Sequence, residues 1–241
     1  GTQGVGGPEN VPGARSGAVS WIDGSGDLWL FGGAGYNSSS WSKLNDLWRY
    51  DIDSGQWTWV SGSDDTTQTG VYGTQGVVDP DNVPGVRCYS VSWTDTSGDF
   101  WLFGGDGYGS SDELGMGPLN DLWRYEPDSG QWTWMSGSDD IRQPGVYGTK
   151  GVADPDTVPR GRKLSTSWID DSGDFWLFGG YGCADSDWGD LNDLWQYDPD
   201  SGQWTWISGS DGVDQTGVYG TQGVAGPDNV PGARTGAMLW S

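Results

Sequence analysis

The sequence contains no histidine, and it has only three lysines and two cysteines among 241 residues. Without histidine, this chain cannot supply a Ser-His-Asp triad, a Cys-His pair or an imidazole-ligated zinc site. Basic residues are scarce as well: 11 Lys and Arg stand against 34 Asp and Glu, which gives a formal net charge of -23. Binding to phosphate backbones requires a basic surface, so we expect no nucleic-acid partner.

Long hydrophobic runs are also missing. No stretch of about 18 apolar residues occurs, so we expect no membrane insertion. The acidic balance, the few lysines and the abundance of Trp, Gly and Thr are typical of extracellular proteins. We therefore expect an extracellular or cell-surface location. Asn37 opens a glycosylation sequon, Asn-Ser-Ser, and is a candidate for modification.

Tryptophan and glycine are abundant instead, with 18 Trp and 44 Gly, and they recur in a fixed order. An apolar run at 26–33 ends in a glycine pair and returns at 98–105 and 173–180. The opening Gly-Thr-Gln-Gly returns at Gly73, Gly148 and Gly220, at spacings of 72, 75 and 72 residues. The chain therefore holds three full repeats and the beginning of a fourth.

Each repeat contains four runs with the pattern of β-strands. In the first repeat they lie at about 16–22, 28–31, 46–51 and 56–60, and aromatic and β-branched residues fill them. Short Gly-, Asp- and Ser-rich segments join the first run to the second and the third to the fourth, as in hairpins. Four antiparallel strands in meander order form one propeller blade, so the predicted fold class is all-β.

The repeat resembles the kelch repeat, in which a glycine pair is followed by a spaced Tyr and a spaced Trp. Those marks are Gly32-Gly33, Tyr50 and Trp57; Gly104-Gly105, Tyr125 and Trp132; and Gly179-Gly180, Tyr197 and Trp204. The resemblance implies a single kelch-repeat region over 1–241, with a β-propeller fold whose innermost strand is the first run. Some kelch propellers resemble galactose oxidase, whose copper site needs histidine ligands that this chain lacks.

Blade boundaries follow from the repeat. We expect blades at about 14–60, 86–135 and 161–207, the start of a fourth at 232–241, and long ordered loops at 61–85, 136–160 and 208–231. Propellers close with about 4–8 blades, so three blades and one strand do not close a ring. Three explanations stay open: a longer parent chain, several chains in one ring, or an open array. We favour a longer chain, or self-association that uses the extra strand.

One face of the blades should carry the long loops together with the segments after each glycine pair, at 34–44, 106–119 and 181–191. Residues that break the repeat are the better candidates for function, because repeated residues serve packing. Exposed aromatic rings beside carboxylates suit carbohydrate binding, and solvated loops without a ligand are the alternative. The leading candidates are Tyr36, Trp41, Asp106, Tyr108, Asp187 and Trp188, followed by Asn37, Lys43, Asp112, Glu113, Asp185 and Asp190.

Cys88 and Cys183 map to the same face on neighbouring repeats. We predict a disulfide between them, with two free thiols as the alternative.

Charged residues that recur once per repeat suggest structural roles. An arginine precedes the first run of every repeat, and we expect these residues to form ion pairs with Asp46, Asp121 and Asp193 rather than an anion site. The Asp-rich turn at 51–55 and its counterparts could attract calcium, but they lack the ligands of an EF-hand loop, so we expect turns and no cofactor. The four arginines are Arg15, Arg87, Arg162 and Arg234.

Three functions remain. The first is a non-catalytic extracellular scaffold, structural or adhesive, that associates with itself or with other proteins. The second is a carbohydrate-binding propeller. The third is an enzyme whose catalytic residues lie outside this segment, which is the least favoured because no catalytic set stands out in the sequence.

Overall fold

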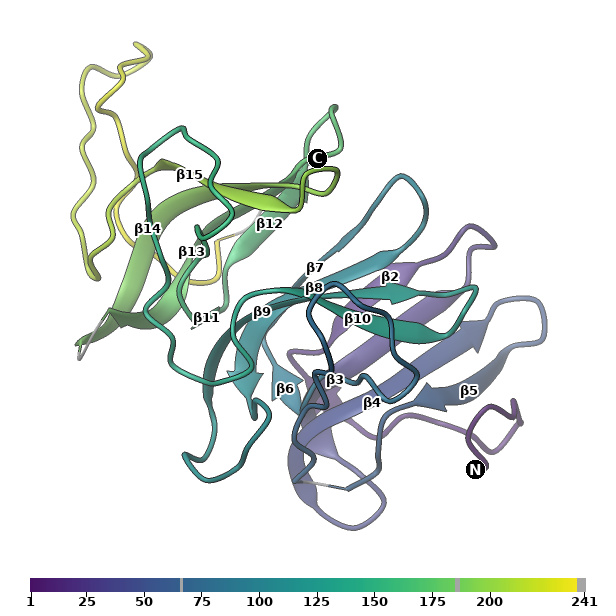
Figure 1. The fold of residues 1–241 in the computed structure, drawn as a ribbon. Coiled ribbons are helices and arrows are strands. Elements are labelled where there is room, and N and C mark those ends of the chain that lie inside the picture. The colour runs from purple at the N-terminus through teal and green to yellow at the C-terminus, as the bar shows by residue number, and fades with distance from the viewer. Residues whose placement is uncertain (66, 185–186, 238–241) are drawn as a thin grey trace.

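The structure is a computed structural model that describes residues 1–65, 67–184 and 187–237. Over these residues the chain is all-β and forms three antiparallel sheets, with no helix (Figure 1). The first sheet contains β1 (Arg15–Ser16), β2 (Val19–Ile22), β3 (Leu28–Tyr36), β4 (Trp41–Asp51) and β5 (Gln56–Ser61). The second contains β6 (Arg87–Cys88), β7 (Val91–Thr94), β8 (Phe100–Gly107), β9 (Gly117–Glu126) and β10 (Gln131–Ser136). The third contains β11 (Arg162–Lys163), β12 (Thr166–Ile169), β13 (Phe175–Ala184), β14 (Asp187–Asp198) and β15 (Gln203–Ser208).

Each sheet is a meander, as the sequence predicts. In the first sheet β1 and β2 both pair with β3, β3 pairs with β4, and β4 pairs with β5. The predicted first run is split in two because Gly17 has a left-handed φ of 65°. Tyr89 and Leu164 take the same conformation at the equivalent positions, with φ values of 61° and 59°. The arrangement is consistent with the blades of a propeller-like fold.

The strands continue beyond the glycine pair, which corrects the expectation of a loop over 34–44. The register between β3 and β4 shifts at Phe31 and Gly33, and pairing then resumes as far as Tyr36 opposite Trp41. The glycine pair is therefore a β-bulge, not a strand end. Its counterpart Gly104 has a φ of 63°, and a Cβ there would lie 2.8 Å from Leu119 O and 2.9 Å from Arg162 O.

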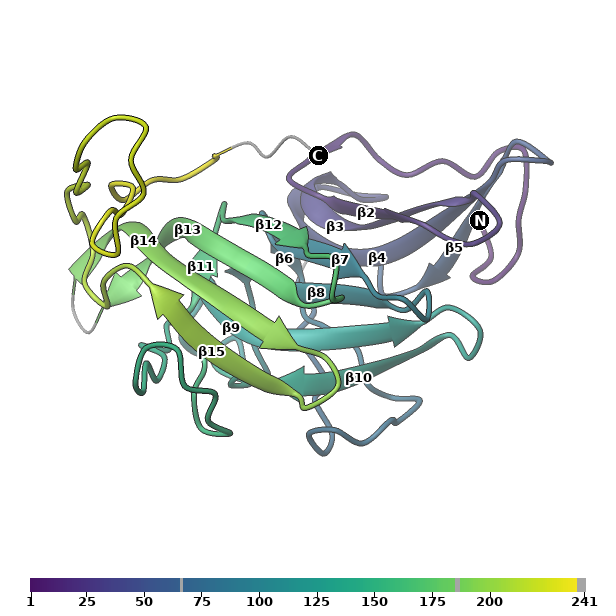
Figure 2. The ribbon, with the colours of Figure 1, turned by 90° about the horizontal axis from the view of Figure 1, so that it is seen from above.

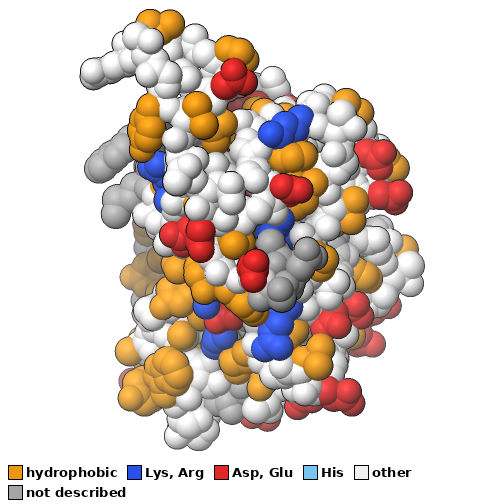
Figure 3. Space-filling view, turned by 90° about the vertical axis from the view of Figure 1, so that its left-hand side faces the viewer, with side chains coloured by type: hydrophobic (Ala, Val, Ile, Leu, Met, Phe, Trp, Pro, Cys, Tyr) orange, Lys and Arg blue, Asp and Glu red, His pale blue; other side chains and the backbone are white. Residues whose placement is uncertain are grey.

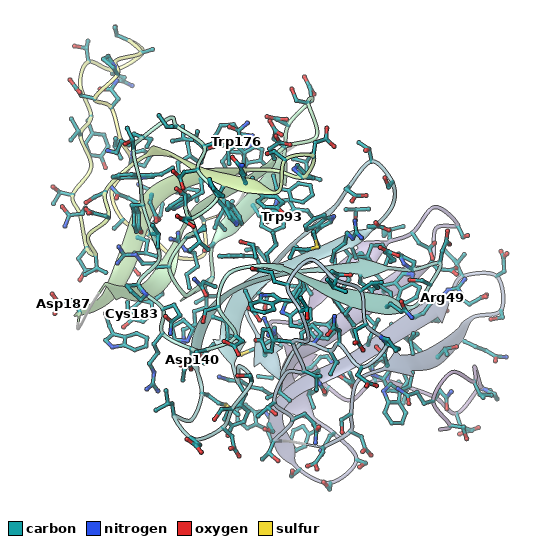
Figure 4. All side chains as sticks on the ribbon, in the orientation of Figure 1. Arg49, Trp93, Asp140, Trp176, Cys183 and Asp187 are labelled. Atoms are coloured by element: carbon teal, nitrogen blue, oxygen red, sulfur yellow. The ribbon has the colours of Figure 1, made fainter. Side chains whose placement is uncertain are left out.

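Aromatic rings fill the spaces between the sheets. Trp21 of the first sheet stacks on Phe100 of the second at 5.2 Å, and Trp93 of the second stacks on Phe175 of the third at 5.2 Å. The ring of Phe31 packs against that of Trp132, and the equivalent ring of Phe103 packs against that of Trp204. The same residue types thus form both cores, and Figure 4 shows Trp93 between the second and third sheets.

Hydrogen bonds also connect the inner strands from sheet to sheet. Tyr89 N–H donates to Gly17 O, Leu164 N–H donates to Tyr89 O, and Gly236 N–H donates to Leu164 O. The indole N–H of Trp21 donates to Trp93 O, and that of Trp93 donates to Trp168 O. β2, β7 and β12 therefore lie side by side, with the outer strands spread away from them (Figure 2).

The long segments at 61–85 and 136–160 are ordered and pack on the sheet that follows each of them. Each is closed by an isolated bridge, for example Val71 with Val83. Tyr72 of the first segment packs on Trp123 of the second sheet at 4.8 Å. Gly76 N–H also donates to Trp134 O, so the segment is fixed to the neighbouring sheet at two points.

The predicted ion pairs of the repeated arginines are confirmed for Arg15, Arg87 and Arg162. Arg87 donates to both carboxylate oxygens of Asp121, at 2.7 and 2.8 Å, and both side chains are buried. The indole N–H of Trp123 and the hydroxyl of Tyr72 donate to the same carboxylate. A buried charge pair of this kind is stable only because every polar atom around it is used.

The third repeat has the same arrangement around Arg162 and Asp193. Burial alone would raise the pKa of Asp193, but Arg162 and the hydrogen bonds from Trp195 and Tyr147 outweigh it and lower that pKa. Burial likewise would lower the pKa of Arg162, and Asp193 reverses the effect. Folding therefore favours the charged form of both groups.

Replacing Asp121 by Asn should strongly destabilise the protein, because the buried Arg87 would keep its charge and lose its counterion. We expect a loss of about 3–5 kcal/mol in the free energy of unfolding, measured by urea denaturation. Asp53→Asn in the exposed turn after β4 is the control and should cost less than about 0.5 kcal/mol. Equal stabilities of the two variants would contradict the structural role of the buried pair.

Candidate functional site

Two exposed aromatic side chains face each other across the end of the β3–β4 hairpin. Tyr36 and Trp41 are register partners, and 58% and 63% of their surfaces are exposed. The third sheet ends in a similar hairpin, where exposed Trp188 stacks near Tyr181 at 6.3 Å. Figure 4 shows Cys183 and Asp187 at the tip of this hairpin. Strand pairing, not a loop, holds these aromatic residues in place.

Asp106 lies between lysines from the two flanking sheets. Lys43 Nζ of β4 is 2.8 Å from Asp106 Oδ2, and Lys163 Nζ of β11 is 3.1 Å from the same atom. Lys163 Nζ also lies 5.9 Å from the ring centroid of Tyr181. This cluster is mostly buried and joins all three sheets at one carboxylate. It brings together two of the three lysines of an otherwise acidic protein.

The charges of the cluster set the ionisation of its members. Burial would raise the pKa of Asp106, but the hydrogen bonds and charges of Lys43 and Lys163 outweigh it and lower the pKa below 3.8. Nearby, burial raises the pKa of the Cys88 thiol, so Cys88 is protonated and unreactive at neutral pH. The cluster is therefore a carboxylate held between two ammonium groups, with one positive charge in excess.

The other predicted residues are not part of this cluster. Tyr108 is half-buried, and its backbone N–H donates to Val86 O. Asp187, Asp112 and Glu113 are exposed, Asp190 is half-buried, and Asp185 lies outside the described residues. Of the six leading candidates, the structure connects Asp106 to Trp188 through Lys163 and Tyr181, and it leaves Tyr36 and Trp41 as a separate pair.

The predicted disulfide between Cys88 and Cys183 is wrong in this structure: both cysteines are free and buried. Cys88 is the register partner of Asp106 and its thiol lies near Asp106 O, whereas the thiol of Cys183 lies near Arg142 O. Cys183 occupies the position equivalent to Tyr108, two residues beyond Asp106 and on the next sheet. The two thiols therefore sit at different register levels of neighbouring sheets.

Asn37 and the Asp-rich turns have local roles. The side-chain oxygen of Asn37 accepts hydrogen bonds from the backbone of Ser39 and Ser40, and its amide donates to Asp64 O. Glycosylation of Asn37 stays a prediction.

In the turn after β4, Asp51 accepts a hydrogen bond from Ser54 N–H, as in an Asx-type turn. Within the described ranges, no group of three or more Cys, Asp or Glu side chains is placed to bind a metal ion.

Lys163 is the functional candidate that sequence reasoning missed. The equivalent positions hold Ser16, Cys88 and Thr235, so Lys163 breaks the repeat and meets the criterion used for the other candidates. Chemically, the cluster offers ammonium donors and aromatic faces without a nucleophile or a free base. Such a surface can bind polar or anionic groups.

Comparison with known proteins defines only the fold. No family model matches the chain, and no curated protein matches it. Among the solved structures that match is one titled "Structure of YjhT", with a TM-score of 0.52 and 14% sequence identity over 81% of this chain. The match covers 52% of that structure, so this chain spans about half of its length. No helix long and apolar enough to cross a membrane occurs in the described part of the chain.

Replacing Asp106 by Asn should lower stability by about 1–2 kcal/mol near pH 7, because two ammonium groups would lose their counterion. The pKa of Asp106 is lowered on folding, so its contribution is complete above its ordinary value of 3.8 and is lost as the pH falls through the lower folded value. The difference between the two proteins should therefore shrink below about pH 3.8 in urea denaturation.

Asp112→Asn, in an exposed loop, is the control for this prediction. A stability difference for Asp106→Asn that persists unchanged at low pH would show that the ion pairs are not its cause.

Proposed function

We propose that the chain is a run of kelch-type propeller blades that serves as a non-catalytic extracellular scaffold for protein association, including self-association. The observation that supports this proposal is that both outer sheets leave aromatic faces open whose counterparts are buried between sheets. The extracellular location and the absence of catalysis are supported by the composition alone.

The open face of the third sheet is lined by Trp168, Phe178 and Leu194, around a groove of about 370 Å³. The equivalent residues of the first sheet, Trp21, Phe31 and Leu47, are buried against the second sheet. Trp168 and Trp176 instead stack on each other at 5.7 Å and are half-buried. Figure 3, which views the molecule from the side of the third sheet, shows groups of hydrophobic side chains at the surface.

The first sheet has the complementary open face. Its residues Leu28, Trp48 and Tyr50 are exposed or half-buried, whereas their counterparts Phe100, Trp123 and Tyr125 in the second sheet are fully buried. Each open face therefore has the same residue types as the sheet faces that pack against each other in the two cores of the chain. A partly exposed aromatic face of this kind favours an interface. The partner is a further sheet of the same type, from a second copy or from a longer parent chain.

The proposal predicts association that depends on concentration. Sedimentation velocity should show species heavier than 25.9 kDa at high concentration. Phe178→Asp should weaken association by about tenfold or more, because it places a charge in the apolar groove. The control is Ile169→Asp, one residue beyond Trp168 and exposed. A protein that stays at 25.9 kDa at every concentration would refute self-association.

Carbohydrate binding is the alternative function, and the exposed rings of Tyr36, Trp41 and Trp188 favour it. Rings of this kind can stack on sugar faces, and the lysines at Asp106 would suit an acidic sugar. A glycan array would test it: binding should be saturable and lost in Trp41→Ala or Trp188→Ala. Binding that survives both substitutions, or no binding at all, would remove this alternative.

A further inference from the structure

A polar pocket lies where the first sheet meets the long segment at 61–85. Its volume is about 360 Å³, and its lining includes Asn45 of β4, Ser61 of β5, Asn82 of the segment and Trp132 of β10. A pocket of the same volume, about 360 Å³, occupies the equivalent place between the second sheet and the segment at 136–160. Chain that the structure describes precedes and follows the second pocket. The cavity is therefore a regular feature of the junction between a sheet and the segment after it.

The same hydrogen bonds fix the walls of both pockets. In the first pocket, Asn45 Nδ2 donates to Pro84 O at 3.1 Å, and Asn45 Oδ1 accepts from Ser63 N–H at 3.1 Å. Asn120 makes the two equivalent hydrogen bonds in the second pocket. Both asparagine side chains are buried, and their amides are used by the fold. The shape of each pocket is therefore set by the protein itself.

Three residues that line the first pocket each carry a buried polar atom with no hydrogen-bond partner among the described residues. The atoms are Ser61 Oγ, Asn82 Oδ1 and Trp132 Nε1. The Nδ2 group of Asn82 donates to Val77 O and to Trp132 O, so only its oxygen is left without a partner. A buried polar group without a partner lowers stability, and native structures contain few of them. Three at one pocket call for a ligand that can pair with them.

The second pocket lacks this set of atoms. Thr157 stands where the first pocket has Asn82, and none of the described residues that line the second pocket has a buried side-chain atom without a partner. Trp204, the counterpart of Trp132, also has an indole N–H without a partner in the described chain, but it is not among those lining residues. The repeat accounts for the cavity, whereas the three converging groups belong to the first pocket alone.

The three atoms match a ligand that carries several hydroxyl groups. The indole N–H of Trp132 can only donate, the amide oxygen of Asn82 can only accept, and the hydroxyl of Ser61 can do both. A ligand hydroxyl is a donor and an acceptor at once, so one type of ligand group can satisfy all three.

The rest of the lining favours a small and neutral ligand. Among the described lining residues Asp81 is the only charged one, and its carboxylate disfavours anions. Pro80 and Val83 add apolar surface on which ring carbons can pack. The volume of about 360 Å³ is at the small end of the range of about 300–1,000 Å³ that ligand pockets span, which suits one sugar ring.

We propose that the first pocket binds one neutral sugar ring, as a free monosaccharide or as one unit of a polysaccharide. The hydroxyl groups of the ring pair with Ser61, Asn82 and Trp132. This site is separate from the exposed rings of Trp41 and Trp188, and it goes beyond the proposed scaffold function without depending on it.

The test is an NMR titration of the isotope-labelled protein with glucose, galactose and N-acetylglucosamine. The indole N–H signal of Trp132 should shift and saturate with at least one sugar, because that group gains a hydrogen bond. The signal of Trp204, its counterpart outside the second pocket's described lining, should stay in place. Glucuronate should bind more weakly because of Asp81. An oligosaccharide that binds more tightly than its monomer would identify a polysaccharide as the source, and equal affinities would identify a free sugar.

Ser61→Ala should raise the dissociation constant about fivefold, because one hydrogen bond to the sugar is lost. It should not lower stability, since Ser61 Oγ has no partner in the described chain. Asn82→Thr, which introduces the residue type of position 157, should weaken binding in the same way. Ser136→Ala, at the equivalent position of the second pocket, is the matched control and should leave the dissociation constant unchanged.

The site would be overturned if none of the three sugars gave a saturable shift at Trp132, or if Ser61→Ala and Ser136→Ala had the same dissociation constant. Binding that is lost in Trp41→Ala but kept in Ser61→Ala would assign the sugar to the exposed rings instead. Sedimentation velocity tests the scaffold function separately, so the two proposals can fail independently.

Discussion

The buried Arg–Asp pair is the interaction on which the rest of the structure depends. Arg87 binds Asp121 of the third strand, Gly104 O of the bulge and Gly85 O before its own strand, while Tyr72 reaches the same carboxylate from the preceding segment. Removing two charges from water is costly, and the cost is offset only when all four chain segments meet. One pair therefore fixes the inner strand, the bulge and the connecting segment together.

Because of this constraint, each sheet needs residues from two repeats. A repeat supplies its own strands, but the phenol of its Arg–Asp site comes from the segment before it. The second and third sheets are complete in this sense, because Tyr72 and Tyr147 reach Asp121 and Asp193, and the first and third sheets lie at the two ends of the series. The open aromatic faces occur at the same two ends. The proposed association would use these faces, whose counterparts in the two cores of the chain are covered by a neighbouring sheet.

The repeat spacing, the meander and the arginine ion pairs could be predicted from the sequence, because each follows from patterns within one repeat. The glycine pair misled the prediction of strand ends, because positive φ angles permit a bulge as well as a turn. The Lys43–Asp106–Lys163 cluster was missed because it joins three sheets and depends on their placement. The disulfide failed for the same reason: two residues of register and one sheet separate Cys88 from Cys183.

The same cluster links the three sheets of the chain through residues that the repeat does not share. Asp106 is matched by Ala34 in the first sheet and Tyr181 in the third, and Lys43 is matched by Asp190 in the third. A contact between a third sheet and a first sheet would therefore bring no ion pair of this kind. Within the chain, charge and aromatic packing act together, whereas in a contact between the open faces of two copies only aromatic packing would act.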